Sequence, residues 1–249
     1  MKIIKITGLI LILSILSACS SSDDPTGLAK SNNAFILFEK AQFAMHSENF
    51  RKAVANLEKL DSLYPFGPYS HQAQLNLIYC YYKLHAYETG ISSADRFIRQ
   101  NPRHKDLDYA YYMKGLINFS TETGFSKELF SAPISERDAS TARQSFDDFA
   151  EMLRLFPASQ YAKDAQQRMI YLRNRLAEYE LHVANYYLQR SAYLAAANRA
   201  KYVVDHYPKT PSVPYALEMM MISYKLLELP ELEENSRRVL LLNYPDHKI

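Results

Sequence analysis

Five proline-containing pairs divide the chain into helical segments. Each pair closes a stretch whose apolar residues recur at helical spacing, and proline is a natural helix terminator at such a point. No stretch shows the strict alternation of apolar and polar residues that is typical of strands. The sequence therefore predicts an all-α fold. The pairs are Tyr64-Pro65, Asn101-Pro102, Phe156-Pro157, Tyr207-Pro208 and Tyr244-Pro245.

The spacing of these prolines indicates a helical-hairpin repeat. Successive prolines are 37, 55, 51 and 37 residues apart, which is near or above the period of about 34 residues in the tetratricopeptide repeat. In that repeat a small residue is required where the paired helices cross closely. The residue twelve positions before the proline is small in four units, as Ala53, Gly90, Ser145 and Ala196. The sequence predicts a solenoid of five tetratricopeptide-like helical hairpins.

The two long spacings are assigned to the third and fourth units. In the third unit the first helix is expected from about Asp108 to Thr123 and its partner from near Ser140, with a loop of about 124–139 between them. In the fourth unit neither Pro nor Gly interrupts residues 159–190, and apolar residues recur at helical spacing throughout. We therefore expect an elongated first helix of about 32 residues, about 48 Å long.

The first 18 residues have the layout of an export signal. A basic start precedes an apolar core over residues 6–16, which is too short to cross a bilayer. The tetrapeptide Leu16-Ser17-Ala18-Cys19 resembles the lipobox of bacterial lipoproteins, so we expect cleavage before Cys19 and a lipid anchor on its thiol. The alternative is an ordinary signal peptide with a chance cysteine. Ser20 follows where an aspartate would, by resemblance, signal inner-membrane retention, which favours the outer membrane.

The rest of the chain divides into three segments. Residues 19–33 are polar, contain Pro and Gly, and are expected to form a flexible tether. Residues 34–138 hold the N-terminal repeats and a groove, and residues 139–249 hold the C-terminal repeats. Once two lysines leave with the signal, 27 basic residues face 27 acidic ones. A neutral chain without a basic run is not expected to bind nucleic acid.

First helices of tetratricopeptide repeats line a concave face, and here they are rich in aromatic residues. Such a groove suggests binding of an apolar or aromatic peptide, with Lys83 pairing a carboxylate. The alternative is that the rings pack against one another or against the tether. The predicted groove residues are Phe35, Phe38, Met45, Leu75, Tyr79, Tyr82, Lys83, Tyr109, Tyr112 and Phe119.

Motifs for catalysis or metal binding are missing from the sequence. It contains no phosphate-binding glycine loop, no metal-ligand spacing of its histidines and no nucleophile elbow. The acidic pairs Asp147/Asp148 and Glu178/Glu180 are expected on solvated helix faces. We expect neither enzyme activity, nor a metal, nor a cofactor.

Several motifs resemble the BamD family of outer-membrane assembly lipoproteins. The most specific is YPFGPYS at residues 64–70, followed by QAQLNLIYCYYK at residues 72–83. The resemblance covers the whole mature chain and also fits five repeats with an elongated fourth-unit helix. Further matches are Asp95-Arg-Phe-Ile-Arg99, Ser159-Gln-Tyr161 and Arg175-Leu-Ala-Glu-Tyr179.

This resemblance implies a non-enzymatic scaffold of the β-barrel assembly machine, lipid-anchored on the periplasmic face of the outer membrane. Its C-terminal repeats would dock the periplasmic domain of BamA and help hold BamC and BamE. Its N-terminal repeats would receive C-terminal targeting segments of nascent outer-membrane proteins. Asn198 and Arg199 resemble the family's Asn-Arg pair, whose arginine meets an acidic residue of BamA. The alternative is a periplasmic tetratricopeptide adaptor lipoprotein acting at the cell wall or in DNA uptake.

Overall fold

The computed structural model describes residues 25–124 and 138–248, with side chains from residue 33 onward. Within these ranges the chain consists of helices and turns and contains no strand, so the prediction of an all-α fold is confirmed. The predicted export signal, Cys19 and most of the third-unit loop lie outside the described residues. The contacts divide the chain into two compact units, residues 1–73 and 74–249.

The first unit contains the hairpin of α2 (Pro25–His46) and α3 (Phe50–Leu63). Small residues of α2 (Ala34, Ala41 and Ala44) are fully buried. Because α2 begins at Pro25, the backbone of residues 25–33 is helical where the sequence suggested a tether. Proline suits this first helical position because its fixed φ matches that of a helix. The N–H that proline lacks would have no partner within the helix at this position.

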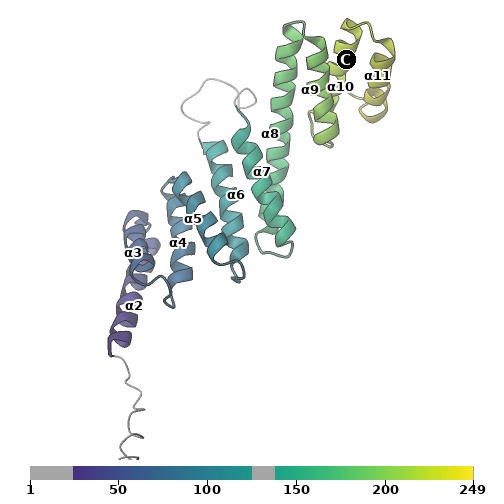
Figure 1. The fold of residues 1–249 in the computed structure, drawn as a ribbon. Helices are drawn as coiled ribbons and strands as arrows, with labels where there is room; N and C mark the ends of the chain where they lie inside the picture. The colour runs from purple at the N-terminus through teal and green to yellow at the C-terminus, as the bar shows by residue number, and fades with distance from the viewer. Residues whose placement is uncertain (1–24, 125–137, 249) are drawn as a thin grey trace, which may run out of the picture. The chain divides into compact units, whose positions relative to one another are not determined.

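The second compact unit, residues 74–249, continues with helices joined by short turns, apart from the loop inside the third repeat (Figure 1). Together with α2 and α3, these helices make five consecutive hairpins in the described part of the chain, as the repeat spacing predicts. α4, which begins at the end of the first unit, opens the series. The helices are α4 (Ser70–Lys83), α5 (Tyr87–Gln100), α6 (Leu107–Gly124), α7 (Ser140–Leu155), α8 (Ala162–Gln189), α9 (Tyr193–His206), α10 (Val213–Leu226) and α11 (Pro230–Asn243).

The elongated first helix predicted for the fourth repeat is present as α8, with 28 residues. It begins at Ala162 and not at Ser159, because the intervening residues form a turn. The N–H of Ala162 donates to the carbonyl of Ser159 at 3.0 Å, and the N–H of Tyr161 donates to the Ser159 hydroxyl at 3.2 Å. The helix is thus about 42 Å long. Its first half lies beside α7 and its second half beside α9 (Figure 1).

Turns inside the hairpins share one backbone feature. A residue with positive φ stands two positions before the second helix in four hairpins, although none of these residues is glycine. The left-handed conformation costs a non-glycine residue about 1–2 kcal/mol, so the helix pairing on either side must offset that cost. The residues are Glu48, His85, Ser191 and Glu228, with φ of 54, 57, 59 and 57°.

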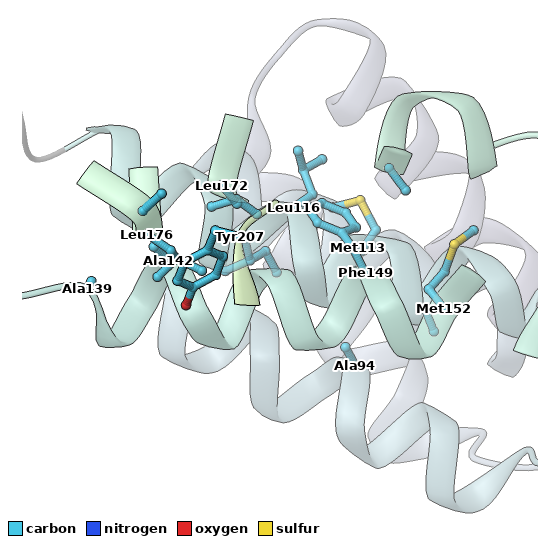
Figure 2. Packing of buried hydrophobic residues seen from close by; sticks show 14 of the residues in the cluster. Ala94, Met113, Leu116, Ala139, Ala142, Phe149, Met152, Leu172, Leu176 and Tyr207 are labelled. Atoms are coloured by element: carbon cyan, nitrogen blue, oxygen red, sulfur yellow. The ribbon is translucent and has the colours of Figure 1, made fainter. Parts of the chain in front are cut away.

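Helices α6 and α7 cross where both carry small residues. Gly115 and Ser145 are buried, and the Ser145 hydroxyl donates to the Gly115 carbonyl at 3.0 Å. A Cβ atom added to Gly115 would lie 2.7 Å from Cδ1 of Phe149. Figure 2 shows Phe149 in the same cluster of buried residues as Met113 and Leu116. The ring therefore occupies the space that a larger residue at position 115 would need.

We expect Gly115→Ala to lower the free energy of unfolding. Alanine favours a helix interior over glycine by about 1 kcal/mol, but overpacking a filled core costs about 1–3 kcal/mol. The net loss should be about 1 kcal/mol, measured by urea unfolding followed by circular dichroism.

Gly124→Ala is the matched control, because it lies at the end of the same helix. The nearest atom to its added Cβ is the Tyr87 hydroxyl oxygen at 3.8 Å, an ordinary contact. Stability should stay unchanged or rise slightly in this variant. Equal stability of both variants would contradict the tight crossing.

Candidate functional site

The predicted anchor, Cys19, lies outside the described residues, so its lipidation stays a prediction. Among the residues that the structure describes, no helix combines the length and apolarity needed to cross a membrane. The same residues contain no cluster of three or more histidine, cysteine or acidic side chains suited to a metal ion. Cys80 is buried, and burial raises the pKa of its thiol to about 12.

In the first unit, two of the predicted groove residues contact one tyrosine. The ring of Phe38 stacks on Tyr69 with centroids 4.9 Å apart, and Phe35 lies 6.1 Å from the same ring. Phe35 remains 48% exposed, whereas Phe38 and Met45 are half-buried. Tyr69 belongs to the motif YPFGPYS, so one role of that motif is to place an aromatic ring against α2.

The YPFGPYS turn is held by its own hydrogen bonds. The Gly67 N–H donates to the Tyr64 carbonyl at 3.0 Å, and the Ser70 hydroxyl donates to the Pro65 carbonyl at 2.5 Å. Phe66, between these contacts, is 99% exposed. A large apolar side chain so fully in water contributes nothing to the core, and single exposed apolar residues of this kind are common on protein surfaces.

α4 carries four of the predicted groove residues, and they differ in burial. Leu75 is only 2% exposed and belongs to the hydrophobic core, so its assignment to the groove is wrong. Tyr79 and Tyr82 are partly buried and pack against that core. Lys83 is exposed at the end of the helix. Of the four predicted groove residues of α4, Lys83 is thus the exposed one, and Tyr79 and Tyr82 are the partly exposed rings.

The predicted groove residues of α6 contact α8 and the turn before it. The ring of Tyr112 stacks on Tyr161 at 4.7 Å, and its hydroxyl donates to Asp164 at 2.7 Å. Tyr109 also contacts Tyr161, at 5.6 Å, while Phe119 has the guanidinium of Arg168 4.7 Å above its ring. The three rings thus help to join two neighbouring hairpins. An open groove is the wrong description for this part of the prediction, and the alternative of ring packing is the better one.

The Tyr112 contact predicts a pH dependence of stability. Burial, together with the bond to the Asp164 carboxylate, raises the pKa of Tyr112 to about 12. An unfolded tyrosine titrates near pH 10, so between about pH 10 and 12 only the unfolded chain releases this proton and stability falls. Urea unfolding at about pH 9 and about pH 11 should show a smaller loss for Tyr112→Phe than for wild type.

Tyr215→Phe serves as control, since it removes a phenol that is 57% exposed on another helix, α10. Its loss of stability over the same pH interval should equal that of wild type. An identical loss in Tyr112→Phe would show that the phenol of Tyr112 titrates normally.

On α9, the structure places Asn198 and Arg199 at the surface, both exposed. They line one open pocket together with Tyr187, Ala195 and Tyr202. Nη1 of Arg199 also donates to Oε2 of Glu180 at 3.0 Å. Arg199 is therefore both a surface residue and the partner of a carboxylate on α8.

Two acidic residues are buried, contrary to the prediction. Glu180 and Asp148 were expected on solvated faces, but they are 3% and 4% exposed. Asp148 accepts a hydrogen bond from Asn118 at 2.6 Å and lies 3.4 Å from the Lys114 amine. Burial raises the pKa of Asp148 despite these contacts, which lower it. Both carboxylates hold neighbouring helices together.

A buried ion pair joins α6 and α8, and helical spacing alone does not reveal it. Nε of Arg175 lies 2.9 Å from Oε1 of Glu122, and the two side chains are 1% and 5% exposed. Arg175 also donates to the Asp138 carbonyl, at 3.4 Å, just before α7. Removing one member of such a pair leaves a buried charge and typically costs about 3–5 kcal/mol. Arg175 thus contacts both ends of the third-unit loop, Glu122 near the end of α6 and the Asp138 carbonyl just before α7.

Comparison with known proteins identifies the family. A family model described as an outer membrane lipoprotein, YfiO, matches residues 30–240. Outer membrane protein assembly factor BamD of Vibrio cholerae is 40% identical over 243 residues, which cover 98% of this chain and 99% of that protein. BamD of Neisseria gonorrhoeae is 36% identical over 244 residues, with 98% and 91% covered. Because these matches extend over nearly the whole chain, the protein belongs to the BamD (YfiO) family of outer membrane lipoproteins.

Proposed function

We propose that this protein is a non-enzymatic scaffold of the β-barrel assembly machine, lipid-anchored at Cys19 on the periplasmic face of the outer membrane. It docks the periplasmic domain of BamA, helps to hold BamC and BamE, and receives C-terminal segments of nascent outer-membrane proteins. The observation that carries the proposal is the 40% identity, over 98% of this chain, to an outer membrane protein assembly factor. Stacked helical hairpins suit the role, since they offer extended surfaces to several partners.

The α9 surface supports BamA docking through its chemistry. Asn198 supplies an amide, Arg199 a guanidinium, and Tyr187 and Tyr202 supply phenols around one pocket. All four groups can donate hydrogen bonds, and no acidic residue lines the pocket. A carboxylate of a partner would find a complementary, charge-assisted site there.

We expect Arg199→Gln to weaken BamA docking. Truncating one member of a hydrogen-bonded charge pair costs about 2 kcal/mol or more, which is roughly thirtyfold in affinity. Co-purification of BamA with the solubilised chain should fall accordingly. Glutamine is preferable to glutamate at this position, because Arg199→Glu would set a second carboxylate beside buried Glu180 and destabilise the fold.

Arg143→Gln provides the matched control for this experiment. Arg143 stands on the other side of the same carboxylate, with Nη2 3.7 Å from Oε1 of Glu180. The variant removes a cation from Glu180 but leaves the Arg199 guanidinium in place, so the loss of BamA should be much smaller than in Arg199→Gln. Equal loss of BamA in both variants would trace the effect to stability and refute docking through Arg199.

Capture of targeting segments is proposed for the partly exposed aromatic residues of each compact unit, residues 1–73 and 74–249, taken separately. In the first unit these are Phe35 and Phe38 on α2, beside Tyr69. In the second unit they are Tyr82 and the neighbouring Lys83. A peptide that ends in an aromatic residue and a free carboxylate matches an aromatic surface with a nearby amine.

Binding of a barrel-protein C-terminal peptide should weaken in Phe38→Ala and in Tyr82→Ala. Loss of an aromatic contact worth about 1–2 kcal/mol corresponds to a roughly five- to thirtyfold lower affinity for the peptide. Fluorescence anisotropy of a labelled peptide measures the affinity, with Tyr215→Ala as an exposed control on α10. Affinities equal to wild type in both test variants would remove peptide capture from the proposal.

A further inference from the structure

Glu180 is a buried carboxylate shared by two arginines from different helices. It projects from α8 and its side chain is 4% exposed. Its Oε2 accepts from Nη1 of Arg199 on α9 at 3.0 Å, and its Oε1 lies 3.7 Å from Nη2 of Arg143 on α7. Both arginine side chains remain almost half exposed, at 47% and 45%. The carboxylate is thus inside the fold while both cations reach the surface.

Each carboxylate oxygen of Glu180 faces a different arginine. Glu180 therefore engages only a small part of the Arg199 guanidinium. The bond to Glu180 uses one terminal nitrogen, whereas a guanidinium carries five N–H donors in a fixed fork. The half-exposed remainder lies at the open pocket on α9, next to Asn198. A second carboxylate can therefore bind Arg199 without displacing the first.

The charge balance decides whether Glu180 helps or hinders such a ligand. Alone, its negative charge would repel a partner's carboxylate. Arg143 faces the other oxygen and offsets that charge, so the three side chains together carry one net positive charge. Asp138 and Asp147 line the pocket beside Arg143 but are exposed, and water and salt screen exposed charges strongly. Arg199 therefore keeps its attraction for an anionic partner.

We propose that Glu180 is a positioning residue for partner docking: from within α8 it holds the guanidinium of Arg199 in place at the α9 surface for a carboxylate of the partner. An arginine that is already ordered does not lose that freedom at the moment of binding, which favours the complex. Arg143 allows a buried carboxylate to do this without repelling the ligand. The inference rests on the proposed docking of BamA through Arg199.

The test is the affinity of the full mature chain for the periplasmic domain of BamA, measured by titration calorimetry for variants at position 180. Glu180→Leu removes the anchor and should weaken binding about tenfold. Glu180→Gln keeps a neutral acceptor for Arg199 and should restore part of the affinity. Both arginines are half exposed, so water solvates them in these variants and the fold should persist.

A double-mutant cycle separates positioning from general stability. In an Arg199→Gln background, Glu180→Leu should change the affinity less than about twofold, because its effect acts through Arg199. An equal loss in both backgrounds would show a merely structural role and overturn the proposal. Tighter binding by Glu180→Leu in the wild-type background would also overturn it, since Glu180 would then compete with the partner.

Two further outcomes are distinguishable. If the wild-type chain does not bind the BamA domain, the proposed docking itself fails and this inference falls with it. If the wild type binds but Glu180→Leu does not fold, Arg143→Gln/Glu180→Gln replaces it, because that pair of changes leaves neither a buried charge nor the cation that balanced it. This variant should also bind more weakly than Arg143→Gln alone, and equal binding would overturn the proposal.

Discussion

The close approach of paired helices at small residues is the constraint on which the other contacts depend. At the α6–α7 crossing, Gly115 leaves room for the ring of Phe149, and the Ser145 hydroxyl reaches the Gly115 carbonyl. The same short spacing lets Asp148 on α7 reach Asn118 on α6 at 2.6 Å. A wider crossing would break this polar contact as well as the apolar packing. The absence of a side chain at Gly115 thus sets how closely α6 and α7 approach each other.

The architecture was predictable because its signals are local. Proline at the helix ends and small residues at the crossings repeat in register, and each has a direct backbone or steric reason. The elongated α8 followed from a long stretch without Pro or Gly. Its start was misplaced by three residues, since the turn around Ser159 depends on hydrogen bonds that periodicity does not show. The helical start of α2 at Pro25 was missed because its polar composition resembles a tether.

The candidate sites were less predictable because they depend on contacts between helices. Repeat positions identified Tyr109, Tyr112 and Phe119 as groove residues, but α8 and the turn before it pack against these rings. Burial of Asp148 and Glu180, in contrast, follows from helical spacing alone. Asp148 follows Ser145 by three residues, and Glu180 follows Leu176 by four, which places both on buried helix faces. Pairing of Glu180 with Arg143 and Arg199 could not be foreseen, since three separate helices supply the side chains.

The length of α8 has a consequence for how the protein unfolds. In a regular solenoid each hairpin contacts only its neighbours, and local units can open one at a time. Here one continuous helix belongs to two contacts, with α7 along its first half and α9 along its second. Opening either contact exposes part of the same helix, so the two hairpins are coupled mechanically. The middle of the chain should therefore behave as a single cooperative block, and hydrogen exchange in α8 should be slower than in the terminal helices.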